Sequence, residues 1–309
     1  MLIHYLRTGD RDFYNMARSG AEHSEQIDNS HKNIHFEEDG YWFIHTVGHA
    51  NNYYPHEMLP ASFELIKSHI GHIFVQGMAE MYKVTGIEAY RDAVVKCGHS
   101  IARYYTVKYD FLTEREPGWG MLALEAAYEL TNDPFYLNAC RIIVERVLEK
   151  QDKKTGCLKY FMYKAECEGE TGEVVYGGKS FMHGIVGTAL KHYYYLTGDA
   201  RARDCVIKIG RWLAEDMYDD EIHAFWYTEG YKQFGHRVNL PEANIEILDT
   251  ILFAAIEGGR KEYLTIVKKA FEKALTSPFR RECDVAKVLS MRLRFAPEIM
   301  FGYHKAMSK

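Results

Sequence analysis

Two glutamates stand where they could carry acid–base chemistry. Glu116 lies in the segment LTEREPGWG and Glu242 in NLPEAN, and each directly precedes a long apolar stretch. Cleavage of a glycosidic bond by water needs one carboxyl that donates a proton and a second carboxylate that holds the water or attacks the sugar. Different surroundings can keep one carboxyl protonated while the other stays ionised. We therefore predict that Glu116 and Glu242 form a catalytic pair.

Two other side chains suit a different reaction, elimination from a uronic acid. That reaction needs a base such as Tyr or His, with cations or amides that neutralise the carboxylate. His183 stands in the apolar stretch SFMHGIVGTAL, and Tyr227 stands in HAFWYTEG. A lone histidine in an apolar helix is more often a hydrogen-bonded core residue, so a structural interpretation of His183 stays open beside the catalytic one.

Histidines are concentrated near the N-terminus, where seven of the 15 fall within 42 residues. His45 and His49 are four residues apart, a spacing that would place them on one side of a helix. Metal binding is one interpretation, but Gly48 and Pro55 disfavour a regular helix and no H-E-x-x-H arrangement is present. We expect sugar contacts or structural hydrogen bonds, no metal site and no cofactor, with a His-bound divalent metal as the alternative.

Aromatic and cationic residues suggest how a sugar would be held. Aromatic residues make up 14% of the chain, including 23 tyrosines, and rings with a polar handle can stack on a sugar and hydrogen bond at its rim. Arg115 could pair with a uronate carboxylate. The predicted substrate-binding residues are His45, His49, His69, Arg115, Trp119, Trp226, His236, Arg237 and Asn239.

A repeated unit predicts the elements that position these residues. An apolar stretch ends in Thr-Gly or its equivalent, an acidic or polar residue follows, and a second amphipathic stretch begins, as near Thr8, Thr85, Thr131 and Thr197, with a degraded copy near Gly258. Gly or Asn suits the left-handed end of a helix, and Asp can cap the next one. Each copy therefore predicts two antiparallel helices, the first in an inner layer and the second in an outer layer.

Four long polar segments connect one hairpin to the next: 28–62, 112–120, 150–178 and 222–244. Long connections at one end of a helical array are where function is usually placed, so we expect all four to converge on one mouth. The third connection predicts a short β-hairpin near 157–178. A sixth helical pair is predicted at 281–293 and 296–307, separated by Pro297.

These residues resemble a known group of folds. The segments SHIGHIFVQGMAEMYKVTG, REPGWGMLALEAAYELTND and SFMHGIVGTALKHYYYLTGD are similar to the (α/α)6 toroids of the six-hairpin glycosidase superfamily, above all to toroid domains of longer pectin- and rhamnogalacturonan-processing hydrolases and lyases. The resemblance implies an all-α toroid and a carbohydrate-active function. A glycoside hydrolase acting on an acidic, uronic or pectic oligosaccharide is our first expectation. A polysaccharide lyase and a non-catalytic glycan-binding or supporting toroid are the alternatives.

Composition limits the remaining classes. The net charge is −5 with no basic stripe, which disfavours a nucleic-acid partner, and no apolar run reaches the length of a membrane span. The six cysteines form no C-x-x-C pair, so disulfides and zinc knuckles are not expected. We expect a single domain over residues 1–309, located in the cytoplasm, whose partner is an oligosaccharide rather than nucleic acid or membrane.

Overall fold

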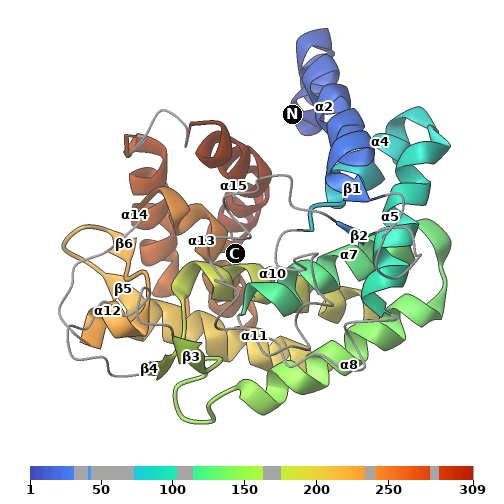
Figure 1. Cartoon of the computed structure of the whole chain (residues 1–309). Coiled ribbons are helices and arrows are strands. Elements are labelled where there is room, and N and C mark those ends of the chain that lie inside the picture. The colour runs from blue at the N-terminus through green and yellow to red at the C-terminus, as the bar shows by residue number, and fades with distance from the viewer. Residues whose placement is uncertain are drawn as a thin grey trace, which may run out of the picture. The chain divides into compact units, whose positions relative to one another are not determined.

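The computed structural model describes residues 1–30, 41–42, 73–102, 114–162, 175–233, 241–278 and 285–308 (Figure 1). Helical hairpins dominate these residues, as predicted. Their bounds are α1 (Leu2–Thr8) with α2 (Arg11–His23), α4 (Gln76–Thr85) with α5 (Glu88–Ser100), α7 (Arg115–Thr131) with α8 (Pro134–Lys150), α10 (Ser180–Thr197) with α11 (Ala200–Trp212), and α13 (Asn244–Glu257) with α14 (Tyr263–Thr276). The predicted all-α fold class is confirmed.

The Thr-Gly turn is built in the same way in four hairpins. In each, the threonine hydroxyl donates to the carbonyl oxygen four residues earlier and accepts the amide N–H two residues later. The residue after the threonine adopts a left-handed conformation, which satisfies a carbonyl at the helix end. These residues are Gly9, Gly86, Asn132 and Gly198. The degraded copy lacks the threonine and reaches the left-handed conformation one residue later, at Gly259.

An aspartate caps the second helix in three of these turns. Asp10, Asp133 and Asp199 each accept, at 2.9 Å, the amide N–H two residues further on. The turn before α5 has Ile87 at this position, and no side chain caps that helix. The repeated turn therefore contains one naturally uncapped copy, which serves as an internal comparison.

We predict opposite effects of substitutions at two equivalent turn positions. Asp133→Ala removes a helix cap and should lower the free energy of unfolding by about 1 kcal/mol, whereas Ile87→Asp should raise it by a similar amount. Urea unfolding followed by circular dichroism measures both. Equal stability of the two variants would contradict the capping role.

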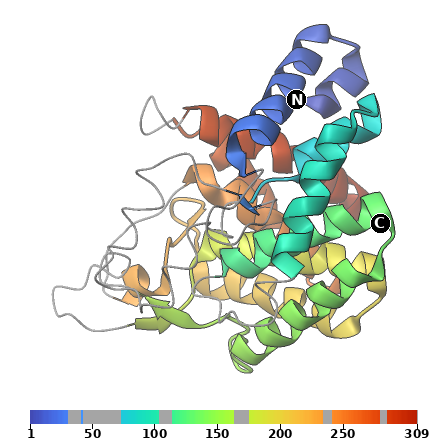
Figure 2. The same ribbon diagram turned by 45° about the vertical axis from the view of Figure 1, so that its right-hand side comes forward.

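Short elements complete the fold. The antiparallel pair β3 (Tyr160–Met162) and β4 (Val175–Gly177) confirms the β-hairpin predicted near 157–178, and the two strands lie side by side in both views (Figure 1, Figure 2). Two further antiparallel pairs are β1 (Asn29–Ser30) with β2 (Tyr41–Trp42), and β5 (Tyr218–Asp219) with β6 (Ala224–Phe225). The remaining helical pieces are α12 (Glu229–Gln233), α15 (Val285–Met307), the π-helical turns Ser24–Asp28 and Leu213–Met217, and the 3-10 turn Pro241–Ala243.

The chain divides into two compact units. The first comprises Met1–Asp110 and Trp119–Ile143, and the second comprises Phe111–Gly118 and Val144–Lys309. In the first unit Gly98 allows α5 to approach α7 closely, since a Cβ atom at that residue would lie 2.6 Å from the Cβ of Ala127. The single domain predicted over 1–309 stays a prediction.

In the second unit the predicted helical pair at 281–293 and 296–307 is wrong. The segments on either side of Pro297 do not form a hairpin, because a single helix, Val285–Met307, runs through the proline. Phe295 and Ile299 are both buried, and Gly302 lies against Leu252 of α13. Packing on both sides of Pro297 thus holds one continuous helix and compensates for the hydrogen bond that a proline cannot make.

Candidate functional site

Three of the four predicted connections meet at the start of α10, within the second unit. The backbone N–H of Lys179, the N-cap residue of α10, donates to Oε1 of Glu114 at 2.8 Å. Ser180 follows, and its N–H donates to the carbonyl oxygen of Tyr227 at 3.2 Å while its hydroxyl donates to that of Trp226 at 2.6 Å. The β3–β4 hairpin leads directly into the same turn. Described residues of three of the four predicted connections, 112–120, 150–178 and 222–244, therefore meet here, and the convergence of all four, including 28–62, stays a prediction because most of 28–62 lies outside the described residues.

His183, in the first turn of α10, is fully buried, and both of its ring nitrogens contact backbone groups. The Leu158 N–H donates to Nε2 at 2.8 Å, and Nδ1 lies 2.9 Å from the carbonyl oxygen of Lys179. A carbonyl oxygen can only accept, so Nδ1 carries the proton and the imidazole is neutral. Burial lowers the pKa of His183 to about 3, against the opposing effect of the Lys179 hydrogen bond. This geometry favours the structural interpretation of His183 over a role as catalytic base.

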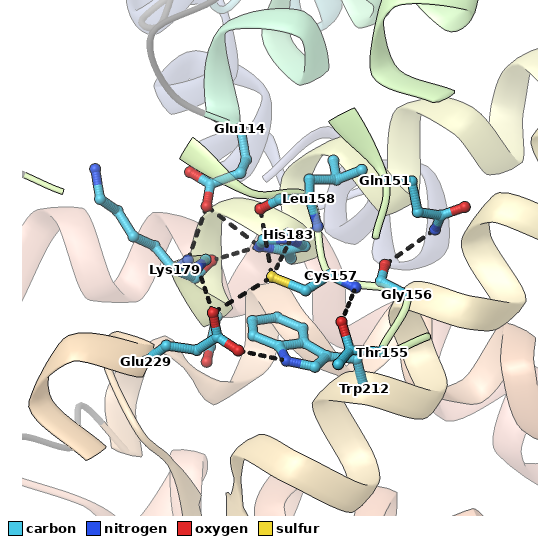
Figure 3. A network of polar contacts seen from close by, with 12 residues as sticks. Glu114, Gln151, Thr155, Gly156, Cys157, Leu158, Lys179, His183, Trp212 and Glu229 are labelled. Atoms are coloured by element: carbon cyan, nitrogen blue, oxygen red, sulfur yellow. Dashed lines mark hydrogen bonds and ion pairs between the residues drawn. The ribbon is translucent and has the colours of Figure 1, made fainter. Parts of the chain in front are cut away.

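The space around His183 is closed by neighbours from distant parts of the second unit (Figure 3). The Trp212 ring centroid lies 4.4 Å from the imidazole centroid, and the Cys157 Sγ lies 3.8 Å from Nε2. A Cβ atom at Gly178 would come within 2.5 Å of both Cys157 and His183. Only glycine therefore fits at the residue that joins β4 to α10. Burial also raises the pKa of the Cys157 thiol, which keeps it protonated and unreactive.

The protonation of His183 predicts a pH dependence of stability. In the unfolded chain this imidazole binds a proton as the pH falls through its ordinary value of 6.5, but the folded protein resists protonation down to about 3. The contribution of neutral His183 to the free energy of unfolding is therefore complete above pH 6.5 and is lost progressively below it. The free energy of unfolding should fall by about 2 kcal/mol between pH 7.5 and pH 5. NMR titration should show a neutral Nδ1–H imidazole that does not titrate in this range.

Unfolding measurements provide the control for this pH effect. The free energy of unfolding of His183→Gln should fall less steeply over the same pH range than that of the wild type, while the exposed-site variant His304→Gln should follow the wild type. A His183 imidazole that titrates near 6.5 would contradict the assigned geometry.

Glu229, the first residue of α12, also binds the turn before α10, and this set of contacts is called the Glu229 clamp (Figure 3). Its Oε2 accepts the Gly178 N–H at 3.0 Å, and its own N–H donates to the Gly178 carbonyl oxygen at 3.0 Å. Oε1 accepts the indole N–H of Trp212 at 3.2 Å. This clamp was not predicted from the sequence, because nothing in the order of residues links Glu229 with a glycine 51 positions earlier.

The aromatic candidates differ in exposure. Tyr227 is partly exposed and stacks on Phe181, with ring centroids 5.3 Å apart and planes 11° apart. Trp226 is partly exposed as well. Trp119, in contrast, is only 5% exposed and packs edge-on against Phe74 in the first unit. So deeply buried a ring offers little surface to a sugar, which favours a core role for Trp119, and its binding role stays a prediction.

The two candidate glutamates lie at helix starts, where the sequence placed them. Glu116 is in the first turn of α7 and 2% exposed, and Glu242 is in the 3-10 turn before α13 and 9% exposed. Asn244 fixes the start of α13, since its side-chain amide donates to the carbonyl oxygens of His223 and Ala270. Arg115, the first residue of α7, is partly buried. The catalytic roles of Glu116 and Glu242 and the binding role of Arg115 stay predictions.

The other predicted binding residues, His45, His49, His69, His236, Arg237 and Asn239, lie outside the described residues. Within the described part of the chain, no group of three or more His, Cys, Asp or Glu side chains could hold a metal ion. None of the helices in the described ranges combines the length and apolar character needed to span a bilayer.

Comparison with known proteins identifies the fold. The sequence matches no family model and no curated protein. Among solved structures, cellobiose 2-epimerase from Bacillus thermoamylovorans is similar at 14% identity and a TM-score of 0.50, over 67% of this chain and 60% of that chain. A GH76 α-mannanase from Bacteroides thetaiotaomicron is similar at 15% identity and a TM-score of 0.49, over 66% of this chain and 59% of that chain. An unsaturated glucuronyl hydrolase specific for heparin is similar at 13% identity and a TM-score of 0.48, over 65% of this chain and 59% of that chain. The match to the epimerase confirms the predicted α/α toroid fold, and this chain spans about 60% of the length of that protein.

Proposed function

We propose that this protein is a glycoside hydrolase that acts on an acidic oligosaccharide. The observation that carries the proposal is the pair of buried carboxyl groups, Glu116 and Glu242, each at the start of a helix that follows a polar connection. The shared fold supports a carbohydrate ligand, because the similar structures include a cellobiose 2-epimerase. Fold alone does not determine activity, so the proposal depends on the residues.

In the proposed reaction one carboxyl group donates a proton and the other, which is ionised, accepts one. One glutamic acid donates its proton to the glycosidic oxygen as the bond to the anomeric carbon breaks. The other carboxylate accepts a proton from the water whose oxygen bonds to that carbon, and proton exchange with solvent then restores both groups. Arg115, at the start of α7 beside Glu116, would pair with a uronate carboxylate and select acidic sugars.

Elimination remains the second candidate, and of the two bases predicted for it, Tyr227 and His183, the contacts of His183 favour Tyr227. His183 uses both ring nitrogens in backbone contacts, so it has no nitrogen available to abstract a proton from substrate. Tyr227 is partly exposed and would be the base of a lyase.

A panel of pectic and uronic oligosaccharides distinguishes hydrolysis from elimination. Elimination creates a C=C bond that absorbs in the ultraviolet, whereas hydrolysis yields reducing ends alone.

We predict that Glu116→Gln and Glu242→Gln each lower turnover by about a hundredfold or more without loss of folding, since each removes an acid–base group. Glu257→Gln is the matched control, because Glu257 is exposed at the opposite end of α13 from Glu242. Reducing-end assays measure turnover, and circular dichroism measures folding.

Two results would contradict the hydrolase assignment. Near-normal turnover of both glutamine variants, together with loss of activity in Tyr227→Phe, would identify a lyase. Absence of any product from the whole panel, with sugar binding retained, would identify a non-catalytic glycan-binding protein.

A further inference from the structure

The stacked pair of Phe181 and Tyr227 has features that a core pair would not need. The two rings come from different elements, Phe181 from the first turn of α10 and Tyr227 from the connection between β6 and α12. They are nearly parallel, at 11° and 5.3 Å between centroids, yet both are partly exposed. Trp212, which packs nearby on His183, is by contrast completely buried. The Phe181–Tyr227 pair therefore lies at the boundary between the buried core and the surface.

Contacts before Phe181 and on both sides of Tyr227 hold the backbone at the two rings. The residue before Phe181 is Ser180, whose N–H and hydroxyl bind the carbonyl oxygens of Tyr227 and Trp226. The residue after Tyr227 is Thr228, which forms a β-bridge with Lys179. Glu229 then closes the segment through its two hydrogen bonds with Gly178. Since these contacts are made within the chain itself, folding orders the aromatic surface, and binding need not supply that ordering.

The chemistry of this surface suits a pyranose ring. A sugar presents C–H bonds on one face, which pack against an aromatic face, and hydroxyl groups at its rim, which need polar partners. Trp226, which directly precedes Tyr227 in the chain, is partly exposed as well, while the carboxylate of Glu229 is engaged by Gly178 and Trp212. A fixed, partly exposed aromatic pair supplies the apolar contact that one face of a pyranose needs.

We propose that the Phe181–Tyr227 pair is a preformed subsite that stacks on one pyranose unit of the substrate. Tyr227 then acts through its ring rather than as a base through its hydroxyl. Phe181 supports that ring from behind, and Glu229 is a positioning residue that holds the segment. This inference rests on the carbohydrate ligand of the proposed function but not on the proposed catalytic pair.

Binding of trigalacturonate and of cellotriose to the full chain tests the subsite, by calorimetry and by NMR of the sugar protons. In the wild type, ring protons of one sugar unit should shift upfield, as protons above an aromatic face do. Tyr227→Ala and Tyr227→Leu should each weaken binding about five- to tenfold. Tyr227→Phe should retain most of the affinity because it keeps the ring.

The matched control is Tyr195→Ala, which removes an aromatic ring that is 63% exposed at the opposite end of α10 and should leave binding unchanged. Unchanged affinity in both Tyr227→Ala and Tyr227→Leu would overturn the subsite, as would a loss in Tyr227→Phe equal to that in Tyr227→Ala. If the wild type binds neither sugar, the proposed function itself fails. The upfield shift needs no variant and therefore tests the subsite even if a substitution impairs folding.

Discussion

The close approach of α10 and α13 is the constraint on which the second unit depends. A Cβ atom at Gly184 would lie 2.1 Å from the backbone oxygen of Glu246, and one at Gly187 would lie 2.2 Å from Oγ1 of Thr250. The order of these contacts shows that the two helices run in the same direction. Parallel helices have their first turns at the same end, so the polar segments that precede them are brought together there. Larger side chains at either glycine would separate the helices and disperse the candidate site.

Beside these glycine contacts, a buried cluster of charged and polar side chains joins α10 to α13 and α15. Lys191 of α10 is buried and donates to Asp249 of α13 at 2.8 Å and to Glu298 of α15, while Thr188 donates to the second oxygen of Asp249 at 2.9 Å. Removing one partner of such a cluster would leave an uncompensated buried charge. The cluster thus selects one register between α10, α13 and α15, which helps explain why α15 continues through its proline.

Local chemistry made part of this fold predictable. The Thr-Gly-Asp turns and the β3–β4 hairpin depend on residues that are neighbours in sequence, and the structure confirms both. Trp119 packs against Phe74, and Glu229 accepts a hydrogen bond from Gly178. Both partners are far away in the chain, and no local sequence pattern specifies these contacts. Glutamates at helix starts are favoured by the helix dipole whether or not they act on a substrate. Their position was therefore predictable, whereas a position at a helix start specifies no function by itself.

The polar groups at the start of α10 limit where chemistry can occur. His183 uses its ring to join Lys179 to Leu158, and Glu229 uses both carboxylate oxygens to hold Gly178 and Trp212. Groups already engaged in this way provide rigidity, and a proton transfer through them would require the turn to rearrange. A rigid turn is nevertheless what a catalytic site needs, because small displacements of a bound sugar from its acid and base cost much of the rate. The engaged groups at the start of α10 therefore suit positioning, and under the proposed function acid–base chemistry would fall to the carboxyl groups of Glu116 and Glu242.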